Sequence, residues 1–319
     1  MDPRPTTSRI AAHILSRLPT RSPLTRPLFI ALQGPQGSGK TYLTSRLSTY
    51  LSSPPHNLSL ATLSLDDLYL PHQQLRALKE RYPLNRLLAG RGLPGTHDLE
   101  LGVRILQGLR DINDDGSRNE VLLPTFEKSL HNGEGDRLPP SPTHSAKGPL
   151  DVILMEGWCM GFSAIASDEL DERWEERVGG EMKRWCAVEH VREVNEMLKG
   201  YEALWAFFDV FVRIIPSPPP SPTPSLDPHD PTSPYAIICK WRLEQEHYMK
   251  AHNGGMGMSD EQVVSFVDRY IPGYIFFSDG ITRGPSVTTI TQKNTPRWIG
   301  KSLRITIGEE REFVGEEVF

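Results

Sequence analysis

The residues with the clearest chemical signature form one short stretch, Gly34-Pro35-Gln36-Gly37-Ser38-Gly39-Lys40-Thr41. It fits the pattern G-x-x-x-x-G-K-[ST], in which a glycine-rich turn aims successive backbone N–H groups at phosphate oxygens. An apolar run precedes the turn and a helix-compatible run follows it, so the turn would join a strand to a helix whose N-terminus favours negative charge. We expect Lys40 to contact the β- and γ-phosphates of a nucleotide and the Thr41 hydroxyl to ligate Mg²⁺.

Carboxylates follow two further apolar stretches. Asp66 and Asp67 follow residues 58–65, and Glu156 follows residues 152–155. Asp66 could accept or position the proton of an alcohol that attacks the γ-phosphate. Because strand side chains alternate, only one of the adjacent pair can point into a site. We therefore take Asp66 as the candidate base, while Asp67 would cap the next turn or hold a magnesium-bound water. Glu156 would reach Mg²⁺ through water or contact the substrate.

Cations and hydrogen-bonding side chains gather after the first strand-end acids. Arg91 lies in a turn-rich stretch, and its planar guanidinium suits a carboxylate or a phosphate. His97 and Asp98 belong to the first turn of a predicted helix and could hydrogen-bond a polyol. Lys128 and Arg137 lie in a charged, glycine-containing loop and could bind an anionic substrate. Helix capping and ordinary solvated charge are the alternatives for these residues.

A second group of cations lies near the start of the predicted helix 236–252. Positive charge on a mobile helix can close over the γ-phosphate and stabilise the transition state. Arg242 is the candidate for this role, and Lys240 is the alternative. An amphipathic helix that carries surface cations would explain the same residues without any catalytic part.

The sequence that must position these residues predicts strands that alternate with helices. The predicted strands span residues 28–33, 58–65, 121–123, 152–155, 206–215, 274–277 and 302–307. The predicted helices span residues 8–18, 42–51, part of 72–90, a segment that Thr96 could cap, most of 167–205, 236–252 and a segment capped by Ser259 with Gln262; residues 124–150 look irregular. This alternation predicts an α/β fold of the three-layer P-loop NTPase type, with a mostly parallel sheet and helices on both faces. Ligands then bind at the carboxyl ends of the strands.

Composition narrows the class of protein. The chain has 319 residues, which suits a single domain over residues 1–319, and its net charge of −5 gives no basic footprint for nucleic acid. No run approaches the roughly 18 apolar residues of a transmembrane helix, so we expect no membrane partner. The three cysteines, Cys159, Cys186 and Cys239, are widely spaced. They predict neither a disulfide framework nor a zinc site, and they favour a reducing compartment.

Two segments lie outside the predicted core. Residues 1–26 are rich in arginine, as in an organelle transit peptide, but Ile10 and Ile14 fall at helical spacing. We favour an N-terminal helix or arm and a cytoplasmic protein, with the nucleus as a further location. Residues 216–234 are rich in Pro and Ser, and we expect a flexible insertion. It is also a candidate docking segment for a partner that binds proline motifs.

Together these motifs resemble the P-loop small-molecule kinases of the phosphoribulokinase, uridine kinase and pantothenate kinase group. In that group a Ser-x-Asp-Asp-Phe-Tyr-like strand end supplies the catalytic acid, and this chain has Ser64-Leu65-Asp66-Asp67-Leu68-Tyr69. Within the group the chain resembles the D-glycerate 3-kinase family, and most of all its fungal members, which are described as ATP-dependent kinases of uncertain substrate. The motifs that carry this resemblance are Gly92-Leu93-Pro94-Gly95-Thr96-His97-Asp98, Lys128-Ser129 with Gly133-x-Gly135-Asp136-Arg137, Glu156-Gly157-Trp158 with Gly161-Phe162, Trp241-Arg242-Leu243-x-x-Glu246, and Gly257-Met258-Ser259-Asp260.

The resemblance implies ATP as phosphate donor and a small hydroxy acid such as D-glycerate as acceptor. The acceptor's carboxylate would explain the cations. The candidate acceptor-binding residues are Asp67, Tyr69, Arg91, His97, Asp98, Lys128 and Arg137. The candidate catalytic residues are Lys40, Asp66, Glu156 and Arg242, with Thr41 and Glu156 as candidates for holding Mg²⁺. One departure is Phe126, which stands where the family motif has Tyr and bears on the acceptor more than on the nucleotide.

Two other functions would use the same phosphate loop. A regulatory switch such as a GTPase is disfavoured because the sequence has no Asn-Lys-x-Asp guanine motif. A nucleotide-binding interaction protein with little turnover would use the proline-rich segment for docking, and it is the alternative to a kinase.

Overall fold

The computed structural model of the chain describes residues 5–19, 25–114, 119–178, 186–219, 225, 227, 229–252, 254–284 and 296–319. Its centre is a six-stranded sheet in the order β10-β9-β8-β1-β7-β2. All neighbouring strands are parallel except β9 and β10, which are antiparallel. The strands are β1 (Leu28–Gln33), β2 (Leu60–Ser64), β7 (Val152–Gly157), β8 (Val210–Pro216), β9 (Leu303–Ile307) and β10 (Phe313–Val318).

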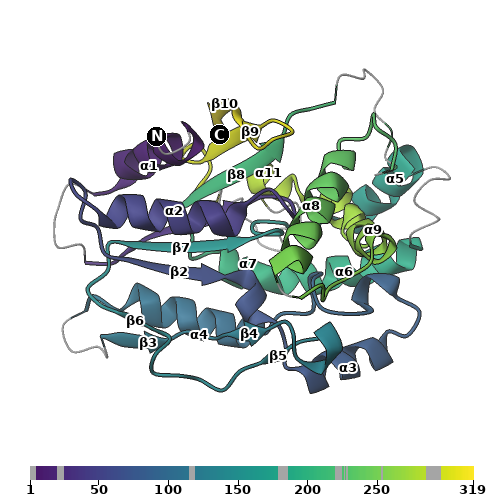
Figure 1. Cartoon of the computed structure of the whole chain (residues 1–319), viewed down its shortest axis with the longest axis horizontal. Helices are drawn as coiled ribbons and strands as arrows, with labels where there is room; N and C mark the ends of the chain where they lie inside the picture. The colour runs from purple at the N-terminus through teal and green to yellow at the C-terminus, as the bar shows by residue number, and fades with distance from the viewer. Residues whose placement is uncertain are drawn as a thin grey trace.

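Alternate side chains of the central strand enter two separate apolar cores. In β1, Phe29 and Ala31 belong to one core, whereas Leu28, Ile30 and Leu32 belong to the other. All six residues of β1 are buried, as expected for a strand covered on both faces. The sheet therefore needs a helical layer on each side. Figure 1 shows this arrangement, with α2 along one side of β7 and β2 and α4 along the other.

The two layers come from different parts of the chain. One core takes side chains from α1 (Pro5–Arg17), α2 (Lys40–Ser52) and α8 (Ala236–His252). The other is covered chiefly by α4 (Leu99–Arg110), α5 (Ser167–Val178), α6 (Val188–Leu198), α7 (Glu202–Trp205), α9 (Asp260–Asp268), α10 (Ile271–Phe277) and α11 (Gly280–Arg283). The predicted three-layer α/β fold with a mostly parallel sheet is confirmed.

Besides α4, smaller elements form along the chain between β2 and β7. They are the 3-10 helix η1 (Leu65–Leu68), α3 (His72–Arg81), the pair β3 (Glu120–Leu122) and β6 (Ser145–Lys147), and the pair β4 (Phe126–Glu127) and β5 (Asp136–Arg137). Short antiparallel pairing thus occurs within residues 124–150, which the sequence predicts to be irregular. No helix in the ranges described above is long and apolar enough to cross a membrane.

Two local predictions were wrong. Residues 274–277 are not a strand but the end of α10, whose seven residues are all buried. A helix that is apolar on every side lacks the 3.6-residue signal, although Pro272 in its first turn fits a helix start. Thr96 does not cap α4. Asp98 does so, by accepting a hydrogen bond from Leu101 N at 2.9 Å, while the Thr96 hydroxyl bonds Leu93 O.

Residues 5–17 form the helix predicted for the N-terminal segment. Ile10, Ala11 and Ile14 are fully buried against α2 and the sheet. Residues 1–4 and 20–24 lie outside the described residues, as do 220–224, 226 and 228 of the proline-rich segment, where the predictions of flexibility and partner docking fall. Helix α1 is therefore part of the core packing.

The burial of α1 predicts a measurable loss of stability. Ile14→Ala should lower the free energy of unfolding by about 2–5 kcal/mol, because it removes a fully buried side chain and leaves a cavity. Ser16→Ala, at an exposed position of the same helix, should change it by less than about 0.5 kcal/mol. Urea unfolding of both variants measures the difference, and equal stability of the two would contradict the packing of α1.

Candidate active site

The predicted phosphate loop lies between β1 and α2, at the carboxyl edge of the sheet. Leu43 N donates to Gly39 O at 2.9 Å, which begins the helical ladder, and Ser38 N donates to Pro35 O at 3.3 Å within the turn. The first N–H groups of a helix have no partner inside the helix and can point at an anion. The Lys40 ammonium donates to Pro35 O at 2.9 Å, so it lies across the loop. Burial lowers the pKa of Lys40, while the carboxylates of Glu156 and Asp66 oppose that shift. This set of donors fits the phosphates of a nucleotide.

The loop is held from outside by helix α8 and by the turn between β9 and β10. Gly37 has φ of 71°, and a Cβ there would come within 2.6 Å of the Trp241 backbone carbon. The Trp241 indole N–H donates to Glu309 O at 2.7 Å. Arg311 Nε donates to Gly37 O at 2.8 Å, and the Arg311 guanidinium lies over the Trp241 ring. Only glycine fits at position 37, because both the backbone conformation and the space exclude a side chain.

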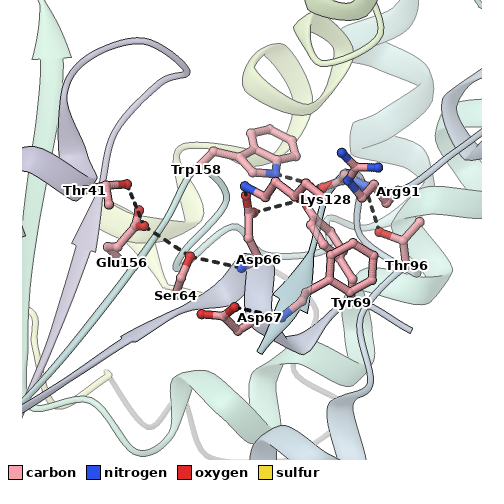
Figure 2. A network of polar contacts seen from close by, with 12 residues as sticks. Thr41, Ser64, Asp66, Asp67, Tyr69, Arg91, Thr96, Lys128, Glu156 and Trp158 are labelled. Atoms are coloured by element: carbon pink, nitrogen blue, oxygen red, sulfur yellow. Dashed lines mark hydrogen bonds and ion pairs between the residues drawn. The ribbon is translucent and has the colours of Figure 1, made fainter. Parts of the chain in front are cut away.

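Glu156 links the phosphate loop to the neighbouring strand. The register pairs Glu156 of β7 with Leu32 of β1 and with Ser64 of β2, so all three strand ends lie at one level. Glu156 Oε1 accepts hydrogen bonds from Thr41 Oγ1 at 3.0 Å and from Ser64 Oγ at 3.1 Å. Figure 2 shows this chain of contacts. Glu156 is buried, and its carboxylate and the Thr41 hydroxyl together provide oxygen ligands that fit Mg²⁺, an ion that binds through few protein ligands.

Asp66 lies at the start of η1 and is held by two side chains. Tyr69 Oη donates to Asp66 Oδ1 at 2.9 Å, and the Lys128 ammonium donates to Asp66 Oδ2. Burial raises the pKa of Asp66, but the Lys128 charge and the hydrogen bonds from Lys128 and Tyr69 outweigh it and bring the pKa to about 2. In Figure 2 the two adjacent acids point apart, with Asp66 toward Lys128 and Asp67 toward the backbone of β4. Asp66 is therefore ionised at neutral pH.

Asp67 and the next predicted acceptor residues have structural partners. Asp67 Oδ1 accepts from Phe126 N at 3.1 Å, and burial raises the pKa of Asp67. Asp98 Oδ2 accepts from Arg137 at 2.8 Å, and Arg137 also donates to Tyr69 O at 2.6 Å. Asp67 still lines the cavity described below, whereas Asp98 and Arg137 do not. Asp98 and Arg137 therefore do not make the acceptor contacts predicted for them. Asp98 caps α4 and pairs with Arg137, which holds the Tyr69 backbone from behind. We call the pair of Asp98 and Arg137 the clamp.

His97 lies behind the same tyrosine. The Tyr69 and His97 rings stack with centroids 4.6 Å apart, and His97 Nδ1 is 2.7 Å from the Tyr201 hydroxyl. His97 is 4% exposed and does not line the cavity. Burial lowers the pKa of His97 to about 4, with an opposing effect from Asp66. The imidazole is neutral at pH 7, and it supports Tyr69 instead of reaching an acceptor.

Arginines form the far wall of the site. Arg91 donates to Gly133 O and lies over the Phe126 ring at 5.6 Å. Arg269, at the end of α9, donates to Arg91 O at 2.8 Å. Both arginines line the cavity, whereas Phe126 does not. Phe126, which stands where the family motif has Tyr, therefore packs against the Arg91 guanidinium but does not itself line the cavity.

Of the two candidate lid cations, only Arg242 reaches the cavity. Arg242 forms an ion pair of 2.7 Å with Glu246, which is 3% exposed, and its guanidinium lies over the Phe266 ring. Glu246 in turn accepts from Met258 N at 2.8 Å, so the pair joins α8 to the segment before α9. Lys240 instead pairs with Glu309 on the turn between β9 and β10.

One cavity of about 810 Å³ joins these groups. It extends from the phosphate loop past Glu156 and Asp66 to the arginine wall. The predicted residues that line it are Gln36, Gly37, Gly39, Lys40, Thr41, Asp66, Asp67, Tyr69, Arg91, Lys128, Glu156 and Arg242. Gly34, Pro35 and Ser38 belong to the same loop but do not line the cavity.

Sequence reasoning missed Arg269, Arg311, Tyr270 and Trp158 as cavity residues. The Trp158 indole donates to Gly92 O at 2.8 Å and lies 4.7 Å from the Tyr270 ring. Trp158 follows Glu156-Gly157 directly, which is the one local signal of its position. Arg269 and Arg311 come from α9 and the last hairpin, and they reach the site only through tertiary packing.

Comparisons with known proteins agree with this geometry. No protein-family model matches the chain. It is 34% identical over 266 residues to the "Probable ATP-dependent kinase TDA10" of Saccharomyces cerevisiae, covering 83% of this chain and 82% of the relative. It is 36% identical over 250 residues to the chloroplastic D-glycerate 3-kinase of Arabidopsis thaliana, covering 78% of this chain and 47% of that protein. The solved D-glycerate 3-kinase of Cryptococcus neoformans var. grubii matches with a TM-score of 0.82 at 37% identity, over 98% of this chain and 99% of that one.

The fold, the phosphate loop and these relatives define an ATP-dependent small-molecule kinase of the P-loop class. Within that class the chain belongs to the D-glycerate 3-kinase family. The resemblance seen in the sequence motifs is confirmed.

The crowded position of Gly37 predicts the effect of one methyl group. Gly37→Ala should weaken ATP binding by at least about tenfold, because the new Cβ would collide with Trp241 and displace the loop. Gly300→Ala is a matched control, since Gly300 also has positive φ but has nothing within 4 Å of its Cβ position. Calorimetric titration with ATP measures both, and equal affinities would contradict the docking of α8 on the loop.

Buried His97 predicts a dependence of stability on pH. Its pKa is about 4 in the folded protein and near 6.5 when unfolded, so between these values the unfolded chain binds the extra proton. Stability should fall on the order of 3 kcal/mol as pH drops from 6.5 to 4. Urea unfolding across this range should show a smaller slope for His97→Asn, while exposed His252→Asn should keep the full slope. An unchanged slope for His97→Asn would show that this histidine titrates normally.

Proposed function

We propose that this protein phosphorylates a small hydroxy acid, with D-glycerate as the leading candidate, using ATP as donor and Mg²⁺ as metal. The observation that carries the proposal is the single cavity in which a phosphate loop, an ionised Asp66 and a cationic wall of Arg91 and Lys128 face one another. The D-glycerate 3-kinases among its relatives support the same acceptor class.

The donor half of the site neutralises phosphate charge. The backbone N–H groups at the start of α2 and the Lys40 ammonium would hold the β- and γ-phosphates. Thr41 and Glu156, joined by a 3.0 Å hydrogen bond, are the residues that would hold Mg²⁺ directly or through water. When bound, the ion would neutralise charge on the transferred phosphoryl group. Arg242, with one guanidinium edge fixed by Glu246, would present its other edge to the same charge.

The acceptor half positions the attacking hydroxyl. Asp66 is a weak base at a pKa of about 2, so its main part is to accept the hydroxyl's hydrogen bond and orient the oxygen toward phosphorus. This suffices for a loose phosphoryl-transfer transition state, in which the nucleophile keeps its proton until late. Tyr69 fixes the Asp66 carboxylate from behind, and the clamp of Asp98 and Arg137 fixes Tyr69.

The cationic wall explains the preference for an acid over a sugar or nucleoside. Arg91, Lys128 and Arg269 line the acceptor end of the cavity, and a guanidinium binds a carboxylate through two parallel hydrogen bonds. A neutral polyol would leave this charge unmatched. We therefore assign the acceptor's carboxylate to this wall and its hydroxyl to Asp66.

The proposal predicts a specific pattern of turnover. ADP release measured across a panel of hydroxy acids, sugars and nucleosides should be fastest with D-glycerate. Asp66→Asn should lower kcat by about 10²–10⁴-fold because the hydroxyl loses its orienting carboxylate. Asp67→Asn should lower it less than about tenfold, since an amide oxygen can still accept from Phe126 N.

Two results would contradict the proposal. ADP release that stays at the acceptor-free rate across the panel, while ATP binds tightly, would favour a nucleotide-binding interaction protein. Full turnover in Asp66→Asn with loss in Asp67→Asn would transfer the orienting role to the second acid.

A further inference from the structure

The contact between Lys128 and Asp66 is at the centre of the acceptor end of the cavity. The Lys128 ammonium donates to Asp66 Oδ2, and Tyr69 holds the other oxygen, Oδ1. Both Lys128 and Asp66 line the cavity, and their side chains are 55% and 31% exposed. Asp66 thus already has a partner on each oxygen in the protein without substrate. Each carboxylate oxygen can accept two hydrogen bonds, so an incoming hydroxyl must approach an oxygen that already has a partner.

The two partners of Asp66 differ in how firmly they are held. The Tyr69 ring is 3% exposed and packed between His97 and Phe126, so it has no room to leave. Lys128 is a long, exposed side chain that follows β4. Its backbone is anchored nearby, because Phe126 N donates to Asp67 and Ser129 N donates to Glu127 at 2.9 Å. The ammonium is therefore the partner that can swing away while its backbone stays beside Asp66.

The charges around Lys128 determine what could draw it away. Asp66 is its main attraction, Glu156 adds a weaker one, and Arg91 repels it. An acceptor carboxylate bound between Arg91 and Lys128 would satisfy both cations. A neutral acceptor or a water molecule offers the ammonium no charge in exchange for Asp66. Ionic hydrogen bonds are roughly twice as strong as neutral ones, so this exchange favours an anion.

We propose that Lys128 makes access to Asp66 depend on the negative charge of the acceptor. Without an acid acceptor the ammonium stays on Asp66; with one, the ammonium moves to the acceptor's carboxylate and Asp66 accepts the acceptor's hydroxyl. The inference rests on the proposed hydroxy-acid kinase function. The alcohol oxygen then bonds to the γ-phosphorus, and the bond between that phosphorus and the oxygen that bridges the β- and γ-phosphates breaks. ADP leaves, and the alcohol's proton passes to Asp66.

This arrangement has two consequences beyond plain substrate binding. Water cannot readily use Asp66 while Lys128 occupies it, so ATP is protected from hydrolysis when no acceptor is present. The carboxylate also becomes a requirement for turnover and not only a source of affinity. Glycerol keeps both hydroxyl groups of D-glycerate and has a neutral CH2OH group in place of the carboxylate, so the two form a matched pair of acceptors.

The test compares Lys128→Met, which keeps the length of the side chain and removes its charge, with Lys147→Met as control. Lys147 is an exposed lysine that pairs with Glu120 and lies outside the cavity. ADP release is measured without acceptor, with D-glycerate and with glycerol, together with KM and kcat for each acceptor. In Lys128→Met, acceptor-free release should rise about tenfold, and the ratio of kcat/KM for D-glycerate over glycerol should fall about a hundredfold. Lys147→Met should match the unmodified protein in every measurement.

Two outcomes would overturn the inference while leaving the proposed function in place. If Lys128→Met raises KM for D-glycerate with acceptor-free release and glycerol turnover unchanged, Lys128 only binds the carboxylate. If kcat falls equally for both acceptors and acceptor-free release falls too, Lys128 acts on the phosphate.

A different result would contradict the proposed function, namely the absence of D-glycerate turnover by the unmodified protein. Even then, a rise in acceptor-free release in Lys128→Met alone would support the pairing as a block on Asp66, and an unchanged rate would overturn it.

Discussion

The site depends on the buried carboxylate of Glu156 and the parallel register that places it. Strands β1, β7 and β2 come from distant parts of the chain, yet their carboxyl ends meet at one level. Glu156 joins them by accepting from Thr41 on the phosphate loop and from Ser64 before Asp66. A buried carboxylate needs such partners to offset its desolvation. The donor and acceptor halves of the site are thereby fixed relative to each other.

Behind this edge, a layer of polar contacts holds the acceptor half. Arg137 bonds both Asp98 and the Tyr69 backbone, and the neutral His97 ring stacks on Tyr69. Arg137, Asp98 and His97 do not line the cavity. They hold Tyr69, whose side chain in turn holds Asp66. Positioning by packed, hydrogen-bonded neighbours is what phosphoryl transfer needs, because the transition state gains more from alignment and charge than from covalent chemistry.

The sequence predicted the features that are set locally. The phosphate loop follows from glycine geometry in eight consecutive residues, and Asp66 and Glu156 follow from apolar runs that end in acids. Helix α10 was missed because a helix buried on every side shows no periodicity. Arg269 and Arg311 were missed because packing of α9 and of the last hairpin, and no local pattern, brings them to the cavity. The sequence also predicted three acceptor-binding residues with suitable chemistry that the fold places behind Tyr69 and outside the cavity, namely His97, Asp98 and Arg137.

The most direct test of the site is a crystal structure of the protein with an unreactive ATP analogue, Mg²⁺ and D-glycerate. We expect the phosphates on the loop from Gly34 to Thr41 and an acceptor hydroxyl within hydrogen-bond distance of Asp66. We also expect the acceptor's carboxylate on Arg91 and Lys128, with the Lys128–Asp66 contact broken. D-Glycerate bound with its hydroxyl groups away from Asp66, or with Lys128 still on Asp66, would contradict this arrangement.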